Sequence, residues 1–143
     1  MKDDKQYEKI TARMCLTHTT GFPNWRWSEA DKKLKMKFEP GTHYSYSGEG
    51  LYLLQFVMQQ LTGKDHETIS HERVLRPLGM TNTSQAWQTR FDENICYGHN
   101  DKGEFYELMK WKESSVGGSM STTFEDFQKF YTQLIIGKGL SKS

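Results

Sequence analysis

The chain has 143 residues, of which 35% are apolar and 13% aromatic, and its formal net charge is +1. This length suits a single domain over residues 1–143, and the aromatic content argues against disorder. The near-neutral charge excludes a globally basic nucleic-acid binder, and no stretch has the ~20 continuous apolar residues of a membrane span.

The first half of the chain predicts two helices. A short helix is expected from Thr11 to about Thr19, with Gly21 as its C-terminal stop. Residues 50–61 form the clearest predicted helix, and Gly63 ends it. Apolar residues recur there at helical spacing and form one expected buried stripe, made of Leu51, Leu54, Met58 and Leu61.

The second half predicts two further helices and a hairpin. Asp65 can cap a helix that runs to about Leu75. Residues 95–108 read ICYGHNDKGEFYEL, a hairpin signal around an Asn-Asp-Lys-Gly turn. The sum predicts a mainly α fold with a small β-hairpin (α+β).

The last predicted helix runs from Thr122 to Ile136 and begins with a capping box. The pair is either Thr122 with Glu125 or Thr123 with Asp126. The residues expected on its inner, buried face are Phe124, Phe127, Tyr131 and Leu134.

Metal and redox patterns are absent from the sequence. His66 and His71 in HETISHE are five residues apart, whereas the zinc-binding helix of metalloproteases needs histidines at i and i+4, so we interpret them as a solvated face. Cys15 and Cys96 stand alone, and two buried thiols are favoured over a disulfide. We expect no metal and no cofactor.

The stretch PGTHYSYSGEGLYLLQ, residues 40–55, places tyrosine and serine hydroxyls next to glycines and directly before the clearest helix. From the residues alone it is either a catalytic hydroxyl at a helix N-terminus or a turn that leads into a buried helix. Ser47 is favoured as a helix cap, and His18 as a structural residue that bonds the last carbonyls of its helix.

Several segments, taken in order, resemble the serine β-lactamase and penicillin-binding-protein family, above all the class C β-lactamases and their esterase and D-alanyl-D-alanine carboxypeptidase relatives. The similar segments are LTHTTGFPNW, FEPGTHYSYSGEGLYLLQFVMQQLTGK, RVLRPLGMTNTS and VGGSMSTTFEDFQKF. The resemblance covers the chain from about Ile10 to Gly137. It implies the helical subdomain of the β-lactamase/transpeptidase-like fold, without most of the α/β sheet subdomain.

The resemblance also implies a site. Family members acylate the serine of an S-x-x-K motif, and a tyrosine from a Y-x-N motif exchanges protons with that serine or the leaving group. Tyr46 is similar in position to that tyrosine. Gly48 stands where the family usually has asparagine, so the resemblance implies that the amide that would hold a substrate carbonyl or orient the lysine is missing there. A phenol ordinarily titrates near pH 10, so the role requires a neighbouring cation. The candidate substrate-binding residues beside it are Gly48, Tyr44 and Trp25.

The chain departs from the family at the nucleophile. No serine in the sequence has a lysine three residues later, and no K-T-G or H-x-G motif follows the last helix. We therefore expect the middle of a catalytic domain that is inactive alone and self-associates through its exposed face. The substrate in the complete protein would be a small molecule or a peptide.

The alternative is a non-catalytic helical module that binds a peptide, a cell-wall fragment or a partner chain. The sequence does not fix the compartment: relatives are often periplasmic or exported, and the start MKDDKQYEKI does not resemble a signal peptide.

Overall fold

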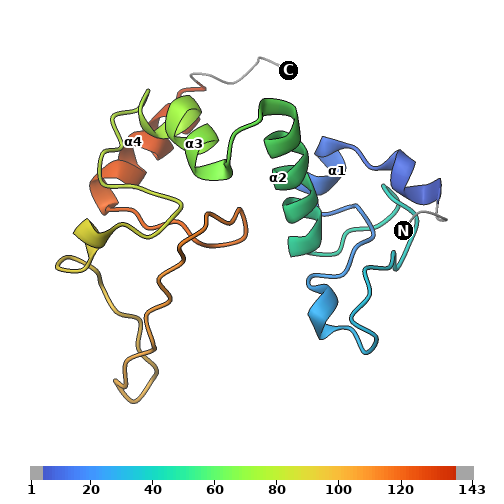
Figure 1. Ribbon diagram of the computed structural model, residues 1–143, viewed down its shortest axis with the longest axis horizontal. Helices are drawn as coiled ribbons and strands as arrows, with labels where there is room; N and C mark the ends of the chain where they lie inside the picture. The colour runs from blue at the N-terminus through green and yellow to red at the C-terminus, as the bar shows by residue number, and fades with distance from the viewer. Residues whose placement is uncertain (1–4, 138–143) are drawn as a thin grey trace. The chain divides into compact units, whose positions relative to one another are not determined.

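The computed structural model describes residues 5–137, which form two compact units that divide at Gly63 (Figure 1). Unit 1 ends with this glycine, and unit 2 begins at Lys64. Each unit combines short helices with long irregular segments, so most of the chain runs in loops held by specific hydrogen bonds.

Unit 1 contains the longest helix. In chain order its elements are η1 (Lys5–Lys9), α1 (Ala12–Leu16), η2 (Arg26–Ser28) and α2 (Gly48–Thr62). Helix α1 packs against α2 (Figure 1). The chain between η2 and α2 is an irregular loop, as the polar sequence predicts.

Unit 2 is built around two helical segments that are far apart in the sequence. Its elements are α3 (His66–Ser70), the π-helical turn η3 (His71–Leu75), η4 (Thr89–Phe91) and α4 (Phe124–Ile135). No strand forms within residues 5–137, and the isolated antiparallel bridges are Ser84 with Ser121 and His99 with Phe105. The expected hairpin is therefore reduced to one bridge beside the turn at Gly103.

Helix starts follow local capping chemistry. The side chains of Thr11, Ser47, Asp65 and Thr123 each accept a hydrogen bond from a backbone N–H of the first turn of their helices. This confirms Asp65 as a cap and decides the last capping pair in favour of Thr123 with Asp126. Helix α2 begins at Gly48, two residues before the predicted start, because its cap is Ser47.

Helix ends are predicted less well. Gly63 ends α2 in the left-handed conformation with φ of 66°, as expected. Helix α1, however, ends at Leu16, and Gly21 is not its stop. Gly21 instead lies in a turn where its φ is 83° and a Cβ would lie 2.3 Å from the carbonyl oxygen of Phe38, so both the backbone conformation and the space require glycine. The helix expected from 66 to 75 changes from α to π at His71.

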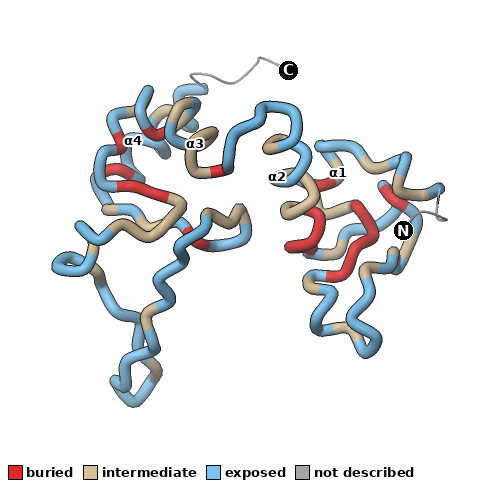
Figure 2. Tube along the Cα trace, viewed as in Figure 1, coloured by how far each residue is buried: buried red, intermediate tan, exposed pale blue. Residues whose placement is uncertain are grey.

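The buried apolar core of the described residues is small: Cys15, Phe22, Leu75 and Met80 (Figure 2). The predicted stripe of α2 is only partly covered, and Leu61 is 82% exposed. The expected inner face of α4 is also wrong, because Phe124, Phe127, Tyr131 and Leu134 are all exposed. The side chain that α4 buries is Asp126, which accepts hydrogen bonds from the chain beneath it.

The cysteines differ in environment. Both are free thiols, but Cys15 is buried whereas Cys96 is exposed, so the expectation of two buried thiols holds only for Cys15. Burial raises the pKa of the Cys15 thiol. Across residues 5–137, none of the helices combines the length and apolar character that crossing a bilayer requires.

Candidate active site at the start of helix α2

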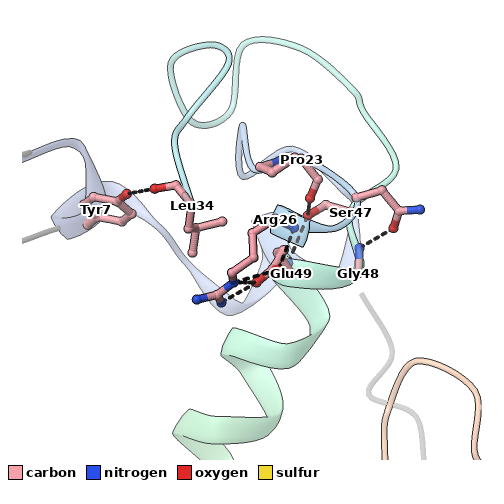
Figure 3. Close-up of polar contacts among 9 residues, drawn as sticks. Tyr7, Pro23, Arg26, Leu34, Ser47, Gly48 and Glu49 are labelled. Atoms are coloured by element: carbon pink, nitrogen blue, oxygen red, sulfur yellow. Dashed lines mark hydrogen bonds and ion pairs between the residues drawn. The ribbon is translucent and has the colours of Figure 1, made fainter. Parts of the chain in front are cut away.

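The site is built on Ser47, the N-cap of α2. Its buried hydroxyl accepts a hydrogen bond from the Gly50 N–H at 2.9 Å and donates to the Pro23 carbonyl at 3.0 Å. One hydroxyl therefore caps the helix and fastens the Pro23 loop to it (Figure 3). This confirms the interpretation of Ser47 as a cap.

Tyr46 lies directly before this cap and is held on both sides by His18. The Ser45 N–H donates to the His18 carbonyl at 2.9 Å, and the Ser47 N–H donates to the His18 Nδ1 at 3.1 Å. The rings of Tyr46 and His18 are 4.4 Å apart between centroids. The tyrosine is thus fixed in the backbone and supported at its ring, while 54% of it stays exposed.

The His18 imidazole does not bond the last carbonyls of α1, contrary to expectation; only the backbone N–H of His18 donates to one of them, that of Cys15 at 3.3 Å. Its backbone adopts φ of 55°, which is uncommon outside glycine and reverses the chain after the helix. This turn brings the imidazole under residues 44–47, where its Nδ1 serves as an acceptor. Its role is structural, but it supports the tyrosine segment rather than the end of α1.

A buried ion pair ties the first turn of α2 to η2. The Glu49 side chain is almost completely buried, and its oxygens accept from Nε and a terminal nitrogen of Arg26 at 2.5–3.0 Å (Figure 3). The backbone N–H of Arg26 donates to the same carboxylate at 2.9 Å. These bonds from Arg26 outweigh the effect of burial and lower the pKa of Glu49. This pair was not predicted from the sequence.

Gly48 faces the loop that precedes η2. Its N–H donates to the side-chain Oδ1 of Asn24 at 2.9 Å, and the next N–H, of Glu49, donates to the Asn24 carbonyl at 3.0 Å. A Cβ at position 48 would lie 2.2 Å from Cη2 of Trp25. The ring of Trp25 therefore occupies the space that any side chain at this position needs.

Trp25 is one of three packed aromatic rings. It stacks on Trp27 with centroids 4.6 Å apart and an interplanar angle of 12°, and it contacts Tyr52 of α2 at 5.4 Å. Trp25 is half-buried, whereas Trp27 is 56% exposed. Tyr44, the other candidate substrate-binding residue, is 70% exposed and meets the His18 ring edge-on at 6.0 Å.

The structure thus places the predicted residues Tyr44, Tyr46, Gly48 and Trp25 in unit 1, around the first turn of α2 and the loops packed on it. The residues that sequence reasoning missed are Asn24 and the pair of Arg26 with Glu49. The sequence did contain a signal for this pair. Glu49 lies between two glycines at the start of the predicted helix of residues 50–61, whose apolar stripe is expected to be buried.

Metal binding is not supported by the side chains that the structure describes. Within residues 5–137, no group of three or more His, Cys, Asp or Glu could hold an ion. His66 is buried and His71 exposed, so the interpretation of a solvated face holds only for His71. Burial lowers the pKa of His66, whose Nε2 lies 3.4 Å from the hydroxyl of Ser70.

Known structures define the class of the fold. The D-amino acid amidase from Ochrobactrum anthropi SV3 in complex with L-phenylalanine gives a TM-score of 0.78 at 24% identity, over 99% of this chain and 46% of the amidase. A class C β-lactamase mutant gives 0.76 at 22% identity, over 95% and 40% of the two chains. The D-alanine carboxypeptidase AmpC from Burkholderia cenocepacia gives 0.73 at 19% identity, over 96% and 40%. The fold is therefore that of part of a β-lactamase-like protein.

Sequence comparison agrees. A provisionally named D-alanyl-D-alanine carboxypeptidase of Escherichia coli K12 is 33% identical over 55 residues, 38% of this chain and 13% of that protein. The family model described as Beta-lactamase matches residues 1–143. The chain belongs to the β-lactamase family, which confirms the resemblance seen in the sequence. It spans less than half the length of the structures it matches.

Proposed function

We propose that this chain supplies the tyrosine-bearing wall of a β-lactamase-like serine hydrolase. The complete enzyme would form and hydrolyse an acyl-enzyme from a β-lactam, an ester or a D-Ala-D-Ala-type peptide. Tyr46 would transfer protons between the nucleophile and the leaving group. The observation that carries the proposal is the presentation of Tyr46, whose backbone and ring are held by His18 while its side chain stays exposed.

Such a presentation suits proton transfer. A group that moves a proton must stay within hydrogen-bond reach of the reacting atoms, so its position has to be fixed before substrate binds. Tyr46 lies next to the cap of a helix of 15 residues, and the N-terminus of such a helix favours negative charge that develops nearby.

The nucleophile would come from outside these 143 residues, because none of their serines has the S-x-x-K spacing. The chain alone would then be inactive. Both units would belong to one domain, since the family model extends over both. Together they would form the helical subdomain that completes its cleft with the sheet subdomain.

Acylation probes test this proposal. A fluorescent penicillin and a fluorophosphonate should both fail to label the isolated chain, and both should label a longer protein that joins these residues to an S-x-x-K segment. In that protein, Tyr46→Phe should lower the acylation rate by roughly 10²–10⁴-fold, the usual contribution of general acid–base catalysis. Tyr106→Phe, at an exposed tyrosine of unit 2, is the matched control and should change the rate little.

Stoichiometric labelling of any serine in the isolated chain would contradict the proposal. So would equal acylation rates for Tyr46→Phe and the parent.

A second candidate function is a non-catalytic module that binds a peptide, a cell-wall fragment or a partner chain. The exposed rings of Trp27 and Tyr44 favour it, because aromatic side chains at a surface are common binding groups. Acylation of the longer protein at a serine would decide against this candidate.

Self-association of the isolated chain is part of the proposal. Helix α4 exposes Phe127, Phe130 and Tyr131, and the ring of Phe127 pairs with each of the other two. Apolar surface of this kind favours contact with a second copy. Sedimentation velocity should show a concentration-dependent dimer. Phe127→Glu should weaken it, whereas Gln128→Glu, which adds the same charge next to it, should weaken it less. A monomer at high concentration would contradict self-association.

A further inference from the structure

The side chain of Asn24 is held at the start of α2 by its oxygen. Its Oδ1 accepts the hydrogen bond of the Gly48 N–H at 2.9 Å, and its backbone carbonyl accepts that of the Glu49 N–H at 3.0 Å. Two adjacent N–H groups of one helix therefore fix the position of a single residue. A carboxamide bonded through its oxygen cannot rotate freely, so its NH₂ group has a defined direction.

The NH₂ group of Asn24 is available as a donor. Asn24 is exposed, and its Nδ2 has no hydrogen-bond partner among residues 5–137. A carboxamide has two N–H donors, and one aimed away from its bonded oxygen can donate to a ligand. This NH₂ group belongs to the residue that is hydrogen-bonded to Gly48, and Gly48 lies two positions after Tyr46.

Trp25 explains why the carboxamide comes from the loop and not from position 48. The edge of its ring lies where a Cβ on residue 48 would be, with Cη2, Cζ3 and Cζ2 at 2.2, 2.4 and 2.6 Å. The ring is kept there by stacking on Trp27 and by contact with Tyr52. Any side chain at position 48 would have to displace this aromatic cluster. While the cluster is in place, position 48 therefore cannot supply a carboxamide.

We propose that Asn24 is a substrate-binding residue, which donates from Nδ2 to the carbonyl oxygen of an acyl substrate, and that Trp25 fixes this assignment by excluding side chains at position 48. The inference rests on the proposed function, since it names the group that holds the substrate of that same site. It also changes the expectation from the sequence that glycine at position 48 leaves the site without an amide.

The first experiment removes the donor and keeps the acceptor. In the longer protein that carries the S-x-x-K segment, Asn24→Asp retains an oxygen for the Gly48 N–H but has no NH₂ group, whereas Asn24→Ala lacks both. With the neutral ester p-nitrophenyl acetate, both variants should lose about 3- to 10-fold in kcat/KM, the effect of one hydrogen bond. Only Asn24→Ala should also lower the urea midpoint of unfolding.

The second experiment moves the carboxamide. Asn24→Ala with Trp25→Ala removes the amide and empties the space over position 48, and adding Gly48→Asn returns an amide there. The triple variant should regain about 3- to 10-fold in kcat/KM over the double variant. Without the Trp25 change, Gly48→Asn should lower the urea midpoint because the tryptophan must leave its stack.

The outcomes separate the two proposals. A longer protein that is neither acylated nor active on the ester would overturn the proposed function, and the inference with it. Normal turnover by the parent with unchanged kcat/KM in Asn24→Asp would overturn the inference alone. Equal kcat/KM for the double and triple variants would also overturn it.

Discussion

The two units each bury one carboxylate in the first turn of a helix, but they satisfy it differently. In unit 1, Glu49 of α2 is bound by the side chain and backbone N–H of a single residue, Arg26. In unit 2, Asp126 of α4 accepts from the Asn82 N–H at 2.7 Å, the Thr83 hydroxyl at 3.0 Å and the Lys129 ammonium at 2.7 Å. Glu49 therefore depends on one partner residue, whereas Asp126 is bound by three.

The difference shows what each carboxylate does for its unit. Glu49 holds Arg26 of η2, 23 positions earlier, against α2, so it fixes the adjoining loop that carries Trp25 and Asn24. Asp126 joins α4 to a segment more than 40 residues earlier through its backbone and a hydroxyl. Unit 2 therefore keeps two neutral donors when its cation is lost, whereas unit 1 keeps only the backbone N–H of residue 26.

Removing the cation from each network should give the largest difference. Arg26→Met leaves a buried carboxylate with one backbone N–H, and we expect it to lower the free energy of unfolding by about 3 kcal/mol. Lys129→Met leaves the Asn82 and Thr83 donors in place, and we expect about 1 kcal/mol. Urea unfolding of both variants measures this. Equal losses would show that the neutral donors of Asp126 contribute nothing.

Acid should destabilise the chain through both carboxylates. Bonds to Arg26 lower the pKa of Glu49; for Asp126, burial raises the pKa, but the bonds from Lys129, Asn82 and Thr83 outweigh it and lower it. A carboxylate with a depressed pKa stabilises the fold above its unfolded-state pKa of about 4, and this stability is lost as the pH falls through the folded-state pKa.

The acid sensitivity should differ between the variants. Urea midpoints measured from pH 6 downward should fall less steeply below pH 4 in Arg26→Met than in the parent, because Glu49 no longer holds a depressed pKa. Lys129→Met should keep more of the parent's slope. A parent whose stability does not change below pH 4 would contradict the ionised state of both carboxylates.

Removing the N-cap should again lower the free energy of unfolding more for α2 of unit 1 than for α4 of unit 2. Ser47→Ala removes both the cap of α2 and the bond to the Pro23 carbonyl, so we expect a loss of about 2 kcal/mol. Thr123→Ala removes only the cap of α4, for which about 1 kcal/mol is typical. Thermal unfolding gives both values, and a larger loss for Thr123→Ala would reverse the comparison.

The smallest effect is expected at the exposed end of α2. Leu61 is 82% exposed, so Leu61→Gln should change the free energy of unfolding by less than about 0.5 kcal/mol. A loss well above this in urea unfolding would mean that Leu61 is covered in solution.

Capping residues could be predicted from the sequence because a cap bonds within one turn of its own helix. Ser47, Asp65 and Thr123 are of this kind, and so is Gly63, whose left-handed backbone ends α2. The order of family-like segments likewise singled out Tyr46 and Gly48, whose roles stay predictions.

The remaining features depend on contacts between distant residues. Apolar periodicity predicted a buried face on α4, but the structure buries Asp126 there, because the periodicity of a helix does not show what packs against it. The pairing of Glu49 with Arg26 and the bond from Gly48 to Asn24 join loops to a helix. Only the folded chain brings these residues together.

The small apolar core also has a calorimetric consequence. The heat capacity of unfolding rises with newly exposed apolar surface and falls with newly exposed polar surface. A chain that buries Phe22 and Leu75 alongside Glu49, Asp126 and several hydroxyls exposes much polar surface when it unfolds. The heat capacity change of unfolding should therefore lie below the usual value of about 12–15 cal/mol/K per residue. The free energy of unfolding should then vary little with temperature around the temperature of maximum stability.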